Sequence, residues 1–277
     1  MNANRFNSFL MPILFIFVFS ISILSPTWAS DKKGIALADL NAAETINALN
    51  VAWYYTWSPN PIKGVALEKF VPMLRSRGGR LLDEQVNSFH KQKKIPTLLV
   101  LNEPNTKEGD NMSAEDVIRS WPEISSLADN IGTPATAGVF SPWFDKFYKM
   151  AKDRNYKMDF MTIHPYSPPD AKLFLNKIDQ VYEKYHLPIW ITEFAVADFT
   201  ASKKHCKTVC ESKYTEQQVL AFMKEVLPEL EKRPYVIRYA WFGAGKASLS
   251  HEQVRTSALF DKDKKLTELG KFYANFQ

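Results

Sequence analysis

The stretch Thr97-Leu-Leu-Val-Leu-Asn-Glu-Pro104 decides how this chain folds. A short, mainly apolar run is followed at once by two polar residues, Asn102 and Glu103, and by a proline, which interrupts regular structure. Apolar runs of this length, bounded by turn residues, are typical of strands buried on both faces of a parallel sheet. We therefore expect a strand over residues 97–101 with a carboxylate where it ends.

Seven further runs of the same kind occur along the chain. The eight expected strands cover residues 34–38, 51–57, 69–74, 97–101, 134–139, 159–163, 189–192 and 236–242. Helical patterns separate most of them, with candidate N-caps at Ser113, Ser141, Asp170 and Thr215. The connection before the third strand has too little room for a helix, so we expect it to be irregular.

Eight strands that alternate with helices predict a single α/β domain, a (β/α)8 TIM barrel. An open, doubly wound sheet is the alternative. It usually brings a glycine-rich phosphate turn, and the sequence has no G-x-G-x-x-G or Walker motif. No repeat, linker or low-complexity stretch divides residues 30–277, so we expect them to form one domain.

Composition and charge exclude several classes of protein. The 277 residues are 45% apolar and 23% charged, which rules out a disordered chain and a collagen-like repeat. The 35 Lys and Arg against 30 Asp and Glu leave a dispersed net charge of +5, too small to indicate a nucleic-acid partner. The sequence carries no sign of an oligomer, and we expect a monomer.

Residues 1–29 have the pattern of a secretory signal peptide. Arg5 precedes an apolar run from Leu10 to Leu24, and the small residues Thr27 and Ala29 lie before the expected cleavage site. A membrane anchor is the alternative, but this run is shorter than the roughly 20 residues of a spanning helix. We expect a secreted protein, periplasmic or extracellular, that keeps no contact with the membrane after cleavage.

The chain has two cysteines, Cys206 and Cys210. In an exported protein we expect them to form one disulfide that closes a short loop. Two free thiols, or a bond to another chain, are the alternatives. Metal ligation is not expected, because His205 is the only further ligand nearby in sequence.

Glu103 and Glu193 both directly follow apolar runs, at the ends of the fourth and seventh expected strands. In a barrel these ends meet at the carboxyl face, where the chemistry takes place. Glycosidic cleavage needs two carboxyl groups there, one to protonate the leaving oxygen and one to attack or to activate water. A structural ion pair or a loop cap is the alternative for either glutamate alone.

Aromatic residues at the strand ends can stack on the apolar face of a sugar ring. Residues 53, 55 and 57 share one side of the second strand, so Tyr55 and Trp57 are expected near the mouth of the barrel while Trp53 packs inside it. Trp241, in the last strand, is also expected to contact the sugar. No histidine spacing suggests a metal, and no motif suggests a cofactor or a serine nucleophile.

An ordered set of segments resembles glycoside hydrolase family 128, within clan A of the TIM-barrel hydrolases. The segments are KGIA (33–36), WYYTW (53–57), FVPM (70–73), LNEPN (101–105), HPY (164–166), WITEFA (190–195) and YAWFG (239–243). They run through nearly all of the chain after the expected signal peptide. The triplet Asn-Glu-Pro alone occurs in many families, whereas the ordered set is far more specific.

The resemblance implies an endo-β-1,3-glucanase that retains configuration and needs no cofactor. It implies that Glu103 is the acid/base and Glu193 the nucleophile, and that Asn102 binds the 2-hydroxyl of the sugar being cleaved. His164 and Tyr166 would orient the nucleophile or line the subsite next to the cleaved bond.

Two other functions fit the sequence. The same residues would serve a retaining hydrolase of another β-linked glycan, such as mannan, xylan or mixed-linkage glucan. A catalytically inactive wall-glycan binding protein is the alternative from another class. The two glutamates and Asn102 argue against it, because binding alone does not require paired carboxylates.

Overall fold

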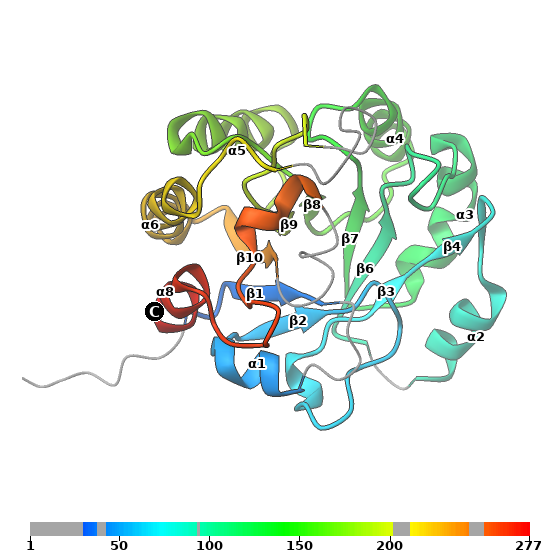
Figure 1. Ribbon diagram of the computed structural model, residues 1–277. Helices are drawn as coiled ribbons and strands as arrows, with labels where there is room; N and C mark the ends of the chain where they lie inside the picture. The colour runs from blue at the N-terminus through cyan, green and yellow to red at the C-terminus, as the bar shows by residue number, and fades with distance from the viewer. Residues whose placement is uncertain (1–29, 38–42, 93–94, 202–210, 244–251) are drawn as a thin grey trace, which may run out of the picture.

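Eight parallel strands surround a common axis, with helices outside them (Figure 1). The structure is a computed structural model that describes residues 30–37, 43–92, 95–201, 211–243 and 252–277. The eight strands are β1 (Lys33–Ala36), β2 (Trp53–Tyr55), β3 (Met73–Leu74), β6 (Thr97–Asn102), β7 (Asn130–Ala135), β8 (Met161–Ile163), β9 (Ile189–Phe194) and β10 (Val236–Phe242).

The strands form two hydrogen-bonded sheets, one in the order β2-β1-β10-β9-β8 and one in the order β3-β6-β7. Isolated parallel bridges join the two sheets: Tyr54 to Phe70 at one seam, and Gly132 to Phe160 and Ala137 to His164 at the other. The predicted α/β barrel is therefore confirmed, with isolated bridges in place of a continuous ladder at each seam. A small hairpin that the sequence analysis did not predict, β4 (Ser76–Arg77) with β5 (Arg80–Leu81), projects after β3.

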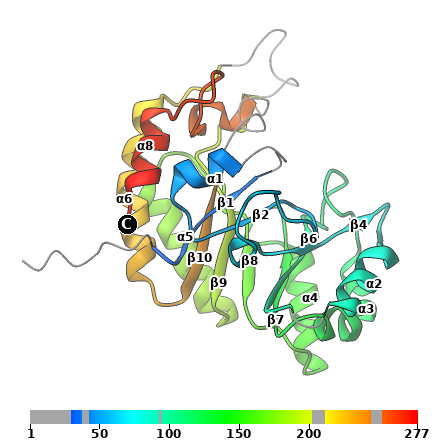
Figure 2. The same cartoon turned by 90° about the horizontal axis from the view of Figure 1, so that it is seen from below.

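The helices flank the strands on the outside (Figure 2). They are α1 (Ala43–Leu49), α2 (Asp83–Lys91), α3 (Ala114–Ser126), α4 (Pro142–Asp153), α5 (Ala171–Tyr185), α6 (Glu216–Lys232) and α8 (Glu268–Asn275), with 3-10 turns η1 (Leu67–Lys69) and η2 (Glu252–Ser257). Among the described residues, none of these helices is long and apolar enough to cross a membrane. η1 occupies the connection before β3 that we expected to hold no α-helix.

Three of the four predicted N-caps accept a backbone hydrogen bond through their side chains. They are Thr215, in a reciprocal capping box with Gln218, Asp170 and Ser113. Ser141 occupies the N-cap position before α4, but its side chain makes no capping hydrogen bond. Pro142 follows it, and its fixed φ suits the first turn of a helix without that bond.

The predicted bounds of the fifth strand, residues 134–139, were wrong by four residues, because β7 covers Asn130–Ala135. The apolar pattern is weak there for a packing reason. A Cβ on Gly132 would lie 2.6 Å from the ring of Phe160, so the barrel admits only glycine at this point. Pro134 stands beside a register shift opposite Val100, where the ladder is irregular and a missing N–H is tolerated.

Two apolar clusters hold the strands in place. The larger one lies between the strands and the helices. The smaller one comes largely from strand residues, including Trp53, Tyr55, Leu99 and Trp190, and Trp57 packs against it. This confirms that residues 53, 55 and 57 share one side of β2. The smaller cluster thus extends from the interior of the barrel to the carboxyl ends of the strands.

Candidate active site

The polar strand ends meet at the carboxyl face of the barrel. Glu103 follows β6, Glu193 lies in β9, His164 follows β8 and Trp57 follows β2. One carboxylate oxygen of each glutamate and a ring nitrogen of His164 all lie within 4.8 Å of one another. Residues distant in sequence thus converge because parallel strands present all their carboxyl ends on one side.

Glu193 is almost fully buried and is held by neutral donors. The indole N–H of Trp57 donates to Oε1 at 2.7 Å, and the hydroxyl of Tyr166 donates to Oε2 at 2.7 Å. The hydroxyl of Tyr55 lies 3.1 Å both from Oε1 and from the carbonyl oxygen of Thr192. These donors stabilise an ionised carboxylate in a place that water reaches poorly.

The tyrosine donors keep their protons. Burial raises the pKa of both Tyr55 and Tyr166 well above the ordinary value, and the nearby charge of Glu193 raises it further. Each hydroxyl therefore remains a donor to the carboxylate throughout the accessible pH range.

Glu103 is more exposed than Glu193, with 26% of its side chain accessible against 7%. Its Oε1 lies 3.0 Å from Nδ1 of His164, and its backbone N–H donates to the carbonyl oxygen of Ala135 at 2.7 Å. Its φ is +47°, and Leu101 two residues earlier has a φ of +56°. Left-handed backbone is costly for such residues, so the surrounding contacts must hold it.

His164 is fully buried between the two glutamates. Its Nε2 lies 3.1 Å from Oγ1 of Thr192 and 3.4 Å from Oε1 of Glu193. Burial lowers the pKa of His164, but the charges of both glutamates and the bond to Glu103 outweigh this, and the net pKa is raised. His164 is therefore the basic centre of the site.

Glu103 shifts in the opposite direction. Burial raises the pKa of its carboxyl, but the hydrogen bond and charge of His164, with a smaller effect of Arg75, leave that pKa lowered. The raised pKa of His164 and the lowered pKa of Glu103 thus have a common cause, the contact between Nδ1 and Oε1.

A pocket of about 390 Å³ opens over these groups. Its lining is Glu103, Ala137, Gly138, His164, Tyr166, Glu193, Ala197, Phe199, Phe242, Gln253 and Val254. Phe242 packs edge-on to the rings of Trp57 and Tyr166, while the side chain of Phe199 is 58% exposed. The pocket thus combines two acidic groups with aromatic faces, a lining suited to a sugar ring.

Trp241 is a correction to the sequence analysis. Its indole is fully buried, packs on Phe194 and Tyr273, and donates to the carbonyl oxygen of Ser257 at 2.9 Å. It faces the helices rather than the pocket, and its neighbour Phe242 occupies the position expected for it. The reason is the ordinary alternation along β10, where Tyr239 and Trp241 belong to the outer cluster and Ala240 and Phe242 to the inner one.

Two polar residues after the strands have distinct positions. Asn102 is partly buried, and its Oδ1 has no hydrogen-bond partner among the described residues. Asp198 is buried and accepts bonds from the N–H and hydroxyl of Thr200 and from the N–H of Lys213. Burial raises the pKa of Asp198, but these bonds outweigh it and lower the pKa to about 2. Asp198 therefore fastens both ends of the segment that contains Cys206 and Cys210, which lie outside the described residues.

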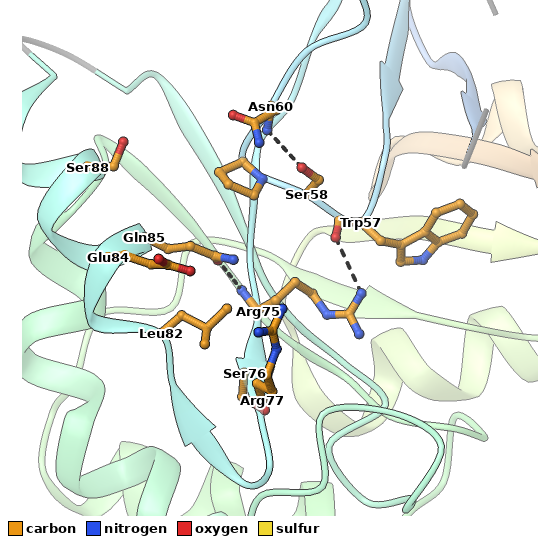
Figure 3. A pocket seen from close by; sticks show the side chains of 11 residues that line it. Trp57, Ser58, Asn60, Arg75, Ser76, Arg77, Leu82, Glu84, Gln85 and Ser88 are labelled. Atoms are coloured by element: carbon orange, nitrogen blue, oxygen red, sulfur yellow. Dashed lines mark hydrogen bonds between the residues drawn. The ribbon is translucent and has the colours of Figure 1, made fainter. Parts of the chain in front are cut away.

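A second hollow, of about 520 Å³, has Trp57 in its lining (Figure 3). It is lined mainly by polar and charged side chains from the segments around β3 to α2, among them Asn60, Arg75, Arg77 and Gln85. Sequence analysis identified none of these, nor Phe199, because no motif or spacing relates them to the glutamates. Only the fold brings them to the same face.

Glu103, His164 and Glu193 also have the residue types of a metal site. The chemistry of their neighbours does not suit an ion. Both oxygens of Glu193 already accept hydrogen bonds from N–H and O–H donors, and these donors would point their protons at a bound cation. The arrangement fits two carboxylates in a hydrogen-bonded network.

Comparisons with known proteins agree with this geometry. The family model described as "Glycosyl hydrolase catalytic core" matches residues 34–273. A mutant of a glycoside hydrolase family 128 subgroup I endo-β-1,3-glucanase from Amycolatopsis mediterranei, in complex with laminaritriose and laminaribiose, is 27% identical with a TM-score of 0.73. The match covers 90% of this chain and 100% of that one.

Two further relatives are more distant. A subgroup II endo-β-1,3-glucanase of the same family from Sorangium cellulosum is 25% identical, with a TM-score of 0.70, over 89% of this chain and 98% of that one. Alkali-sensitive linkage protein 1 from Schizosaccharomyces pombe is 25% identical over 256 residues, which are 88% of this chain. The chain spans 44% of the length of that curated relative.

Proposed function

Because the chain belongs to the glycosyl hydrolase catalytic core family, we propose that it is a secreted endo-β-1,3-glucanase that retains configuration. The observation that carries this proposal is the pair of glutamates, with oxygens within 4.8 Å across the pocket and with different surroundings. Glu193 is buried among neutral hydrogen-bond donors, and Glu103 is more exposed and contacts Nδ1 of His164. The two carboxyl groups are thus prepared for different tasks.

In the proposed mechanism Glu193 attacks the anomeric carbon and Glu103 protonates the departing oxygen. The covalent glycosyl ester is then hydrolysed by water, which Glu103 deprotonates as a base. His164 supplies or accepts the proton along its 3.0 Å contact with Glu103. The short distance between the carboxylates supports direct attack, because inverting enzymes keep them about 6.5–9.5 Å apart to admit a water.

The proposed substrate class is supported by the family and by the shape of the carboxyl face of the barrel. The neighbours named above include β-1,3-glucanases, one of them crystallised with laminari-oligosaccharides. The Oδ1 of Asn102, beside Glu103, is buried without a partner among the described residues, and a hydrogen bond from the sugar 2-hydroxyl would satisfy it. Trp57 lines the second hollow and packs on Phe242 of the pocket, so the hollow could receive further sugar units of a chain, which supports internal cleavage.

A reducing-sugar assay tests the substrate class. Linear β-1,3-glucan, β-mannan, xylan and mixed-linkage glucan are compared, with the Glu193→Gln variant as the blank for each. Release from β-1,3-glucan alone is the expected result. Release from another of these polymers would assign the same machinery to that glycan. No release from any of them, with binding retained, would indicate an inactive binding protein.

The stereochemistry has its own measurement. Proton NMR of the fresh product should show the β-anomer first, because two inversions at the anomeric carbon restore the starting configuration. An initial α-anomer would identify an inverting enzyme and would remove the nucleophilic role of Glu193.

Export and the disulfide complete the proposal. We expect cleavage after Ala29 and one bond between Cys206 and Cys210, which the entropic model values at only about 2 kcal/mol because the loop is short. Mass spectrometry of the exported protein and thiol titration of the denatured, unreduced chain test both. An uncut N-terminus or two free thiols would contradict them.

A further inference from the structure

Arg75 and Asp110 form an ion pair that connects two strand ends of the catalytic face. Arg75 directly follows β3, and its Nε lies 2.9 Å from each carboxylate oxygen of Asp110. The side chain of Asp110 is fully buried and that of Arg75 is 25% exposed. Water therefore screens this pair far less than it screens a surface ion pair.

Asp110 accepts a hydrogen bond from the N–H of Ser76, next to Arg75, and also bonds to the backbone beside the proposed acid/base. Its Oδ2 accepts from the N–H of Asn102 at 2.5 Å, and its own N–H donates to the carbonyl oxygen of Asn102 at 2.8 Å. Gly109 allows this close approach, because a Cβ there would lie 2.2 Å from the carbonyl oxygen of Glu103. The segment before α3 thus packs directly against the backbone that carries Glu103.

Arg75 reaches the other glutamate through Trp57. Its Nη1 donates to the carbonyl oxygen of Trp57 at 3.4 Å (Figure 3), and the indole of Trp57 donates to Glu193. Both ends of the ion pair thus lead to left-handed residues, Trp57 with a φ of +51° and Glu103 with a φ of +47°. Such backbone persists only where the surroundings over-determine it.

We propose that the Arg75–Asp110 ion pair is a positioning clamp that holds Glu103 and, through Trp57, Glu193 face to face. The inference rests on the proposed catalytic roles of the two glutamates. Asp110 is a positioning residue, because it reaches Glu103 only through the backbone of Asn102.

Asp110→Asn keeps the volume of the side chain and removes its charge. The acid/base should then be misplaced, and we expect kcat on laminari-oligosaccharides to fall about 10- to 100-fold. KM should change by less than about threefold, because the binding surfaces remain. Arg75→Met removes the other partner and should act in the same direction on kcat.

Asp179→Asn is the matched control. Asp179 on α5 also forms a two-contact ion pair, with Nε and Nη2 of Arg233 at 2.7 and 3.0 Å, but neither residue lies at the catalytic face. This variant removes a comparable pair and should lower the melting temperature without changing kcat at 25 °C. It separates lost stability from lost positioning.

The pH profile gives a readout that a purely structural role would not move. The ionisable groups that face Glu103 are His164, Glu193, Arg75, Tyr55 and Tyr166. Asp110→Asn leaves the charge of Arg75 uncompensated, so the alkaline limb of kcat/KM should move to lower pH. Arg75→Met leaves the carboxylate of Asp110 uncompensated, so the same limb should move to higher pH.

The experiment measures kcat, KM and the pH profile of the wild type, the two clamp variants and Asp179→Asn. A wild type that is inactive on every β-glycan would contradict the proposed function and, with it, the clamp. Opposite limb shifts with the expected loss of kcat support the clamp. An active wild type whose clamp variants match Asp179→Asn in kcat, or shift the limb in one direction, would overturn it. Should Asp110→Asn not fold, Arg75→Met decides: a lower kcat with the limb moved to higher pH supports the clamp, and a kcat equal to that of Asp179→Asn or a limb moved to lower pH overturns it.

Discussion

The two ends of the barrel hold buried charge in opposite ways. At the carboxyl end the anion of Glu193 is surrounded by the neutral donors Trp57, Tyr55 and Tyr166, beneath an open pocket. At the amino end the cation of Lys33, fully buried, donates to three carbonyl oxygens at the end of α8. One charge faces a substrate and the other faces only the protein, so one should control activity and the other stability.

Residues with left-handed backbone also have different roles at the two ends of the barrel. His186 adopts this conformation as the C-cap of α5, which is a common way to end a helix. Trp57 and Glu103 adopt it next to strand ends, where it aims a functional side chain. The same left-handed geometry thus ends a helix at the amino end and orients Trp57 and Glu103 of the candidate site at the carboxyl end. The predictions below test this division.

The largest effect is expected at the two glutamates. Glu103→Gln should lower kcat by about 10²–10⁴-fold on polysaccharide, because glutamine cannot donate the proton. Glu193→Gln should nearly abolish turnover, because no glycosyl ester can form. Neither change should lower the melting temperature, and azide should partly restore turnover in Glu193→Ala with formation of the inverted glycosyl azide. Substantial activity in Glu193→Gln would refute the assigned role.

Smaller losses are expected for the donors to Glu193. Trp57→Phe and Tyr166→Phe each remove one hydrogen bond to a charged group, a contribution of about 1.5–3 kcal/mol, or roughly 10- to 100-fold. The loss should appear in kcat for the glycosylation step, measured with aryl glycosides. Unchanged kcat in both variants would mean that the remaining donors suffice to hold the carboxylate.

Much of the fold and of the candidate site could be predicted from the sequence, and the parts that could not have physical reasons. The short apolar runs before Glu103 and Glu193 are bounded by turn residues, so both strands and both carboxylates could be predicted. The side of β10 that faces the pocket was not, because Trp241 and Phe242 are adjacent aromatic residues and only the packing shows which of them points inward. The clamp joins residues 75 and 110 with no local signal, and only the barrel brings them together.

At the amino end Lys33→Met should affect stability alone. It leaves carbonyl oxygens of α8 without their donor, which costs about 1–3 kcal/mol. The melting temperature should fall by roughly 2–4 °C per kcal/mol for a domain of this size. Glucanase activity at 25 °C should stay unchanged, and a large loss of kcat would show that the two ends are coupled.

The same residue gives a pH dependence of stability. Burial lowers the pKa of Lys33 from 10.5 to about 8, and the charge of Glu231 opposes this only in part. Between these values the unfolded chain binds the proton that the folded chain has released, so the free energy of unfolding rises with pH. The stability advantage of the wild type over Lys33→Met should therefore increase from about pH 8 to 10.5 in urea titrations. A constant difference would show that Lys33 keeps its ordinary pKa.

The smallest effect is expected at Arg238, also near the amino end. Its guanidinium lies 4.6 Å from the ring centre of Trp190 and 5.5 Å from that of Trp53, which makes it a cation held by aromatic faces. Arg238→Met retains much of the packing and removes the cation–π contribution, about 0.5–2 kcal/mol. Because Trp53 also stacks on Tyr55 inside the barrel, a shift of its ring would be felt at Glu193. We expect no such transmission. The variant should have a slightly lower melting temperature and an unchanged kcat. A lower kcat would show that Arg238 affects Glu193 through the rings of Trp53 and Tyr55.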